Sequence, residues 1–146
     1  MPTAETDTIR HILNSYRTVA VVGLSPKPHR ASFDVTRYMQ AQGWRIIPIN
    51  PNAQEILGVK AYPSLLEAAK HEKIELVNVF RNSEDVPPVA QDAISIGAKA
   101  LWLQKGIENT EAAASARAAG LEFVQNRCLM VEHAAHAGKG LTTTDS

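Results

Sequence analysis

The sequence contains a single cysteine, so it cannot form an internal disulfide or supply a multi-thiolate zinc or iron–sulfur site. It also lacks an excess of either charge, because 15 Lys and Arg residues balance 15 Asp and Glu residues. That neutrality argues against a general nucleic-acid-binding protein. No apolar run approaches the roughly 20 residues of a membrane-spanning helix, and the N-terminus lacks the basic and apolar regions of a signal peptide. We therefore expect a cytoplasmic protein that binds neither nucleic acid nor membrane.

The composition is that of an ordinary globular protein. The 146 residues are 45% hydrophobic and 21% charged, which suits one domain with a substantial core. Residues 138–146 (GKGLTTTDS) show no apolar periodicity. We therefore predict a single folded domain over residues 1–137 and a disordered tail over residues 138–146.

Short apolar runs alternate with segments of helical pattern along the domain. Strands are predicted over residues 18–22, 44–49, 75–80, 99–103 and 121–124. Helices are predicted over residues 5–16, 33–42, 65–71, 83–96, 110–119 and 127–136, and residues 55–62 are expected to be irregular or a short edge strand. This alternation predicts a single-domain Rossmann-like three-layer α/β sandwich with a mostly parallel sheet of about five strands.

In such a sheet, ligands bind beyond the carboxyl ends of the strands. The loops at that edge begin at Gly23, Asn50, Phe80 and Gln104. The first loop, GLSPKPHRAS, begins with a glycine, which permits a tight turn. It also contains hydroxyl groups and cationic side chains, namely Ser25, Lys27, His29, Arg30 and Ser32. Ser32 is also placed to cap the helix predicted at Phe33. This set favours a phosphate site over the alternative of an ordinary surface loop with a helix cap.

The sequence departs from the common nucleotide fingerprints. The first turn reads GLSPKP rather than GxGxxG, and the second strand ends at Asn50 rather than at an acid that would bind the ribose of NAD. The Walker pattern is also absent. Residues 8–54 carry six Lys and Arg residues but a single acid, although the whole chain is neutral. These features favour a nucleotide with additional phosphate around its ribose.

Several segments together resemble the CoA-binding domain family. They are VVGLSPKPHRASFDVTRYMQAQGW, PINPNAQEILGVKAYPSL, VNVFRNSEDVPP, ALWLQKGIEN and NRCLMVEH. The family includes small stand-alone bacterial proteins and the N-terminal domain of the succinyl-CoA synthetase α subunit. The resemblance spans residues 15–133 and implies a Rossmann-type domain whose ligand is coenzyme A. The phosphorylated histidine of that synthetase lies in a further domain, so the ligase activity does not carry over.

The resemblance also implies a role for each loop. Phosphates would be held by Gly23, Ser25, Lys27, Arg30 and Ser32. Asn50 and Pro51 would border the adenosine, Phe80 and Arg81 would line the third loop, and Gln104, Lys105 and Gly106 would lie toward the pantetheine arm. The leading hypothesis is therefore a protein that binds CoA or acyl-CoA without catalysis of its own. A homo-oligomer, and a partner subunit that supplies CoA to a larger complex, are further possibilities that stay open.

Two alternatives stay open at this point. One is an NAD(P)-dependent oxidoreductase, and the other is an acyl-CoA transferase that uses Cys128 at the start of the last helix. We expect Cys128 to be a small buried hydrophobic residue rather than a nucleophile. We expect His133 and His136 to be solvated or to stabilise the end of the helix rather than to bind a metal. No catalytic or metal-ligating residue is assigned.

Overall fold

The computed structural model describes residues 4–136, and the tail predicted over residues 138–146 lies outside them. Five parallel strands form the central sheet: β1 (Thr18–Val22), β2 (Arg45–Ile49), β5 (Leu76–Val79), β6 (Ala100–Leu103) and β7 (Glu122–Val124). A separate antiparallel hairpin, β3 (Glu55–Ile56) and β4 (Val59–Lys60), lies in the segment expected to be irregular or a short edge strand. The predicted parallel sheet is confirmed.

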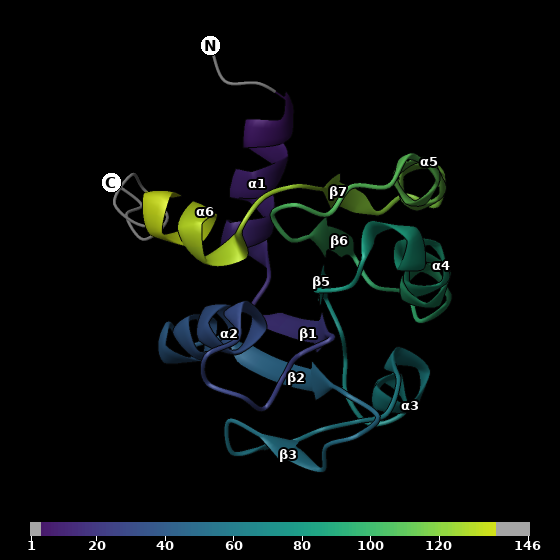
Figure 1. Cartoon of the computed structure of the whole chain (residues 1–146). Helices are drawn as coiled ribbons and strands as arrows, with labels where there is room; N and C mark the ends of the chain where they lie inside the picture. The colour runs from purple at the N-terminus through teal and green to yellow at the C-terminus, as the bar shows by residue number, and fades with distance from the viewer. Residues whose placement is uncertain (1–3, 137–146) are drawn as a thin grey trace.

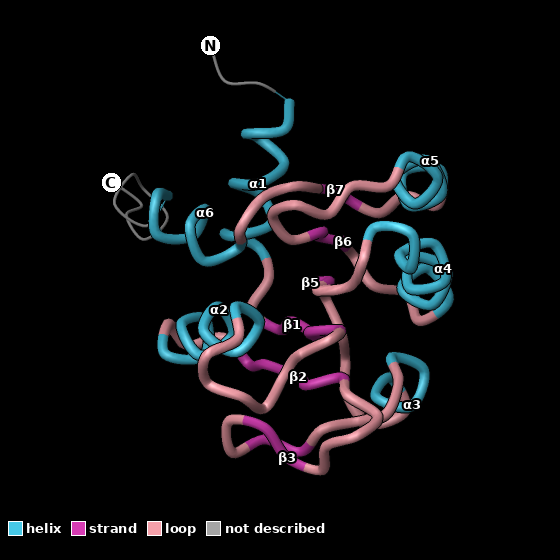
Figure 2. The backbone as a smooth tube through the Cα atoms, viewed as in Figure 1, coloured by secondary structure: helices cyan, strands magenta, loops and turns pink. Residues whose placement is uncertain are grey.

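Helices cover both faces of this sheet. One face carries α1 (Ala4–Ser15), α2 (Ala31–Ala41) and α6 (Leu129–His136), and the other carries α3 (Leu65–Ala69), α4 (Val86–Ser95) and α5 (Thr110–Ala118) (Figure 1). A 3-10 turn, Ser83–Asp85, precedes α4. Figure 2 shows the strands between the two helical layers, which confirms the three-layer Rossmann-like sandwich. Within residues 4–136, no helix has both the length and the apolarity to cross a membrane.

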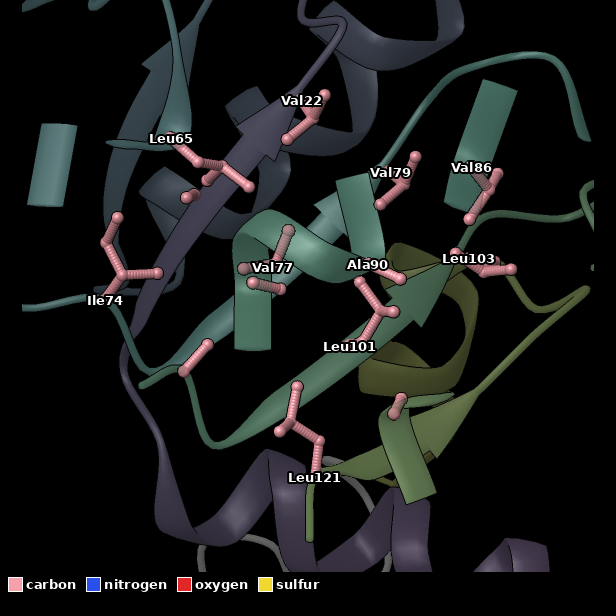
Figure 3. Packing of buried hydrophobic residues seen from close by; sticks show 14 of the residues in the cluster. Val22, Leu65, Ile74, Val77, Val79, Val86, Ala90, Leu101, Leu103 and Leu121 are labelled. Carbon is pink, nitrogen blue, oxygen red and sulfur yellow. The ribbon is translucent and has the colours of Figure 1, made fainter. Parts of the chain in front are cut away.

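Alternate residues of each strand point to opposite layers, which gives the protein two cores. On β5, Val77 packs with α3, α4 and α5, whereas Leu76 packs with the layer formed by α1, α2 and α6. Figure 3 shows the first core, where Val77 and Leu101 of the sheet lie near Ala90 of α4. Because the strands are buried on both faces, they read in the sequence as continuous apolar runs.

The helix that follows the first loop begins earlier than predicted. α2 starts at Ala31, and the residue before it is Arg30, whose side chain makes no capping hydrogen bond. Ser32 lies inside the first turn and is buried, and its Oγ accepts a hydrogen bond from the Ser25 N–H at 3.0 Å. The prediction that Ser32 caps the helix is therefore wrong, because its hydroxyl bonds across the loop instead.

The strand order decides where a ligand can bind. The order is β2-β1-β5-β6-β7, so the chain passes from β1 to β2 on one side and then returns to β5 on the other side of β1. This reversal makes the carboxyl ends of β1 and β5 the topological switch point of the sheet, which is where open α/β sheets bind their ligands. The loops that begin at Gly23 and Phe80 consequently lie next to each other.

Candidate functional site

Gly23 and Phe80 bring the two switch-point loops into close backbone contact. The Phe80 N–H donates to the Val22 carbonyl at 2.8 Å, and the Gly23 N–H donates to the Ile49 carbonyl at 3.2 Å. Gly23 has a φ of +87°, and a Cβ atom built on it would lie 2.3 Å from the Phe80 carbonyl oxygen. Only glycine therefore fits this position, for reasons of both conformation and space. The predicted tight turn at Gly23 is present.

The first loop is held in shape by its own serines. The Ser25 N–H donates to Ser32 Oγ, and the Lys27 N–H donates to Ser25 Oγ at 3.1 Å. The Arg30 N–H then donates to the Lys27 carbonyl at 3.0 Å, directly before α2. These bonds fold the loop over the start of α2, whose positive dipole end stabilises anions. Both hydroxyls retain a hydrogen that they can donate to a ligand.

Four cations around the site have no acidic partner in the described part of the chain. Lys27, Arg30, Arg81 and Lys105 are all exposed, and none of them forms an ion pair with a carboxylate among residues 4–136. Arg45, by contrast, forms an ion pair with the carboxylate of Glu72. The positive charge at this edge of the sheet is therefore available to an anionic ligand.

Asn50, which was expected to border the adenosine, is held in place by hydrogen bonds within the protein. Its Nδ2 donates to the Leu24 carbonyl at 2.9 Å, and its Oδ1 accepts from the Asn52 N–H at 2.7 Å. Both ends of the amide are thus used to fasten the loop after β2 to the loop after β1. Asn50 shapes the wall of the site, and its neighbour Pro51 is exposed beside it.

Three adjoining cavities follow this edge. The loop cavity, about 430 Å³, is lined by Gly23, Ser25, Lys27, Arg30, Ala31, Ser32 and Phe80. The β2 cavity, about 270 Å³, is lined by Gly23, Leu24, Ser25, Pro26, Ile49, Asn50, Pro51, Asn52, Phe80 and Arg81. The apolar cavity, about 600 Å³, is lined by Ala31, Asp34, Val35, Phe80, Arg81, Asn82, Gln104, Lys105, Ile107, Cys128, Met130 and Val131. Phe80 lines all three, so it lies where they meet.

All residues that the resemblance assigned to the site except Gly106 line at least one of these cavities. Gly106, which the resemblance placed toward the pantetheine arm, instead lines a separate polar hollow with Ser83, Glu108 and Asn126. The sequence reasoning missed the wall of the apolar cavity that comes from α2 and α6, including Val35 and Met130. The helical spacing of Val35 predicted only that it faces the core. Cys128 is partly buried and lines this cavity, so it is less buried than we expected.

No cluster of three or more His, Cys, Asp or Glu side chains among residues 4–136 could hold a metal ion. His133 is 8% exposed, and its Nδ1 lies 2.9 Å from the Tyr38 hydroxyl. Burial lowers the pKa of His133 and raises that of Tyr38. The expectation of a solvated His133 is therefore wrong, because this histidine joins α6 to α2 inside the protein.

The sheet order and the loops at its switch point define a Rossmann-like α/β domain with a site at the ends of β1 and β5. Comparison with known proteins gives the family. The family model described as CoA binding domain matches residues 17–134, and the chain belongs to that family. The predicted resemblance is confirmed. The family does not favour the NAD(P)-dependent or transferase alternatives.

Relatives include both stand-alone proteins and parts of larger enzymes. YneT, an uncharacterized protein of Bacillus subtilis, is 42% identical over 126 residues, which cover 86% of this chain and 92% of YneT. The ADP-forming acetate–CoA ligase II of Archaeoglobus fulgidus is 29% identical over 85 residues, which cover 57% of this chain but only 12% of the ligase.

Solved structures share the whole fold. A hypothetical protein from Pyrococcus horikoshii is 40% identical, with a TM-score of 0.85 over 92% of this chain and 95% of its own. Prb, a protein redesigned for binding, is 38% identical, with a TM-score of 0.88 over 98% of this chain and 99% of its own.

Proposed function

We propose that this protein binds coenzyme A or an acyl-CoA across the switch point, as a binding module without catalysis of its own. The observation that carries the proposal is a set of exposed cations, without acidic partners in the described part of the chain, beside three cavities that meet at Phe80. Membership of the CoA-binding domain family supports the ligand, and the charge and shape of the site support its orientation.

The phosphates of CoA fit the loop cavity. That cavity lies at the start of α2 and is lined by Lys27 and Arg30, which have no acidic partner among the described residues. Backbone amides at a helix N-terminus and mobile cations are the groups that bind phosphate. The adenosine then fits the β2 cavity, whose wall includes Asn50 and Pro51.

The pantetheine arm fits the apolar cavity. The arm is uncharged, with amide groups between short aliphatic stretches, and the cavity combines apolar side chains such as Val35 and Met130 with the carboxamide of Gln104. Its volume of about 600 Å³ lies within the range of ligand-binding pockets. The same cavity leaves room for a small acyl group on the thiol.

Calorimetric titration tests the ligand. We expect CoA to bind tightly, dephospho-CoA to bind more weakly because it lacks the phosphate on the ribose, and NAD to bind weakest. The proposal would be refuted if NAD bound and the titration with CoA showed no binding. Mass spectrometry of small molecules released from the purified protein gives an independent reading of the ligand.

A matched pair of charge variants tests the site. Arg30→Gln removes a cation from the loop cavity, whereas Arg10→Gln removes an exposed cation from α1 that lines none of the three cavities. A charge-assisted hydrogen bond contributes about 1.5–3 kcal/mol. We therefore expect Arg30→Gln to weaken CoA binding by about 10-fold or more and Arg10→Gln to leave it unchanged. Equal effects of both changes would refute the assignment of the phosphates to this loop.

A further inference from the structure

The only cysteine of the chain lies in the wall of the apolar cavity. Cys128 is partly buried, forms no disulfide, and directly precedes α6. Its carbonyl accepts the hydrogen bond from the Glu132 N–H at 2.9 Å, so the backbone of Cys128 already belongs to the first turn of that helix. The thiol is consequently carried by an ordered part of the structure.

The backbone on both sides of Cys128 is hydrogen-bonded to β6 and to Gln104, the residue that follows it. The indole N–H of Trp102, which is fully buried, donates to the Arg127 carbonyl at 2.8 Å. The Leu129 N–H donates to Gln104 Oε1 at 3.3 Å. These bonds set the thiol over the carboxyl end of β6, beside the switch-point loops.

The side-chain amide of Gln104 provides a hydrogen-bond donor for a ligand in this cavity. The residue is 7% exposed and lines the same cavity as Cys128. Its Oε1 is held by Leu129, but its Nε2 has no hydrogen-bond partner among residues 4–136. The protein does not fully enclose this Nε2, so an acceptor on a ligand in the cavity can take its hydrogen bonds. In the pantetheine arm, the acceptor nearest the thiol is the carbonyl of the terminal amide, and a short ethylene link joins that amide to the sulfur.

A pantetheine arm held by Gln104 would carry its sulfur into the cavity whose wall includes Cys128. Resting on the binding of CoA proposed above, we propose that Cys128 forms a mixed disulfide with CoA by exchange with the disulfide form of CoA. The Cys128 thiolate attacks one sulfur of that disulfide, so the bond from Sγ to CoA forms as the original S–S bond breaks. The departing CoA thiolate keeps the electron pair and takes up a proton, which balances the proton that Cys128 released. Cys128 is oxidised as the departing thiol is reduced, and no further oxidant is required.

The rate of adduct formation tests this proposal. The protein is mixed with CoA disulfide, and in parallel with cystamine, a small disulfide that carries no nucleotide. Intact-mass spectrometry follows the growth of the adduct. The control combines Cys128→Ser with Ala114→Cys, which moves the thiol to an exposed position on α5 outside the three cavities.

Cys128 should react with CoA disulfide on the order of 100-fold faster than the control thiol does, because binding places the two sulfurs together. With cystamine this advantage should disappear, and excess reduced CoA should slow the reaction of Cys128. The same ratio of rates for both disulfides would overturn the proposal.

Titration of reduced CoA into Cys128→Ser separates the two possible failures. If this variant binds CoA but the wild type shows no preference for CoA disulfide, the disulfide proposal fails and the proposed function stands. If neither the variant nor the wild type binds CoA, the proposed function fails and the disulfide proposal fails with it.

Discussion

The close approach of Gly23 to Phe80 predicts a large and specific effect of adding one methyl group. In Gly23→Ala the new Cβ would overlap the Phe80 carbonyl, which is backbone and cannot rotate away, at 2.3 Å. The ends of β1 and β5 would have to separate. A matched control is Gly120→Ala, because Gly120 has a φ of +88°, almost the same as the +87° of Gly23, but has nothing within 4 Å of the place that its new methyl group would take.

The two variants therefore share one cost and differ in another. An L-residue in the left-handed region costs about 1–2 kcal/mol, and this applies to both. Forcing a methyl group into a packed site costs about 1–3 kcal/mol more, and this applies to Gly23→Ala alone. Since about 2–4 °C of melting temperature corresponds to 1 kcal/mol in a domain of this size, Gly23→Ala should melt several degrees below Gly120→Ala.

Urea denaturation and calorimetric titration with CoA together check the reasoning. Gly23→Ala should lose both stability and CoA affinity, because the displaced strand ends carry two of the ligand loops. Gly120→Ala should lose some stability and keep its affinity. Equal destabilisation of the two variants would show that the contact with Phe80 carries no energetic cost. Normal CoA binding by Gly23→Ala would show that the CoA site does not lie at the switch point.

Replacing Asn78 by leucine should raise the free energy of unfolding, measured by urea titration, by about 1 kcal/mol. The reason is that Asn78 is 1% exposed and its Oδ1 has no hydrogen-bond partner among the described residues. A loss of stability would contradict this prediction. Ser32→Ala should lower the free energy of unfolding by about 1 kcal/mol, since it leaves the Ser25 N–H without its acceptor, and it should also weaken CoA binding. Because burial holds the pKa of His133 below its ordinary value of 6.5, the unfolded chain binds that proton more readily, and stability falls as the pH drops below about 6.5. His133→Gln should flatten this part of the pH profile, and an unchanged slope would assign the loss to other groups.

The parts of the fold that follow from local chemistry could be predicted from the sequence. β1 and β5 are short apolar runs because both of their faces are buried, and each is followed by residues suited to a turn. The parallel order then directs the ligand loops to one edge, whatever contacts they make there. This is why Gly23, Phe80 and Gln104 could be assigned to the site without the structure.

The contacts between distant segments could not be predicted in this way. Nothing near Gln104 in the sequence signals that its carboxamide holds the Leu129 N–H, and nothing near Tyr38 signals His133. Ser32 misled the prediction for a related reason, since a serine at a helix start caps the helix unless a closer donor across the loop takes its hydroxyl. The part of the apolar cavity formed by α2 and α6 was missed because these two helices lie far apart in the chain.

The meeting of three cavities at Phe80 limits the ligands that can fill the site. A compact nucleotide would occupy the loop cavity and the β2 cavity and leave the apolar cavity to water. An elongated ligand with phosphates at its middle and an uncharged arm at one end can match the exposed cations and the apolar wall at the same time. The neutral total charge of the chain is compatible with this, because a small anion responds to the local field of Lys27 and Arg30 rather than to the sum over the protein. On the proposed function, selectivity for CoA over ADP would therefore depend on the apolar cavity and on the contacts to the ribose phosphate, and the affinity for both would depend on the loop.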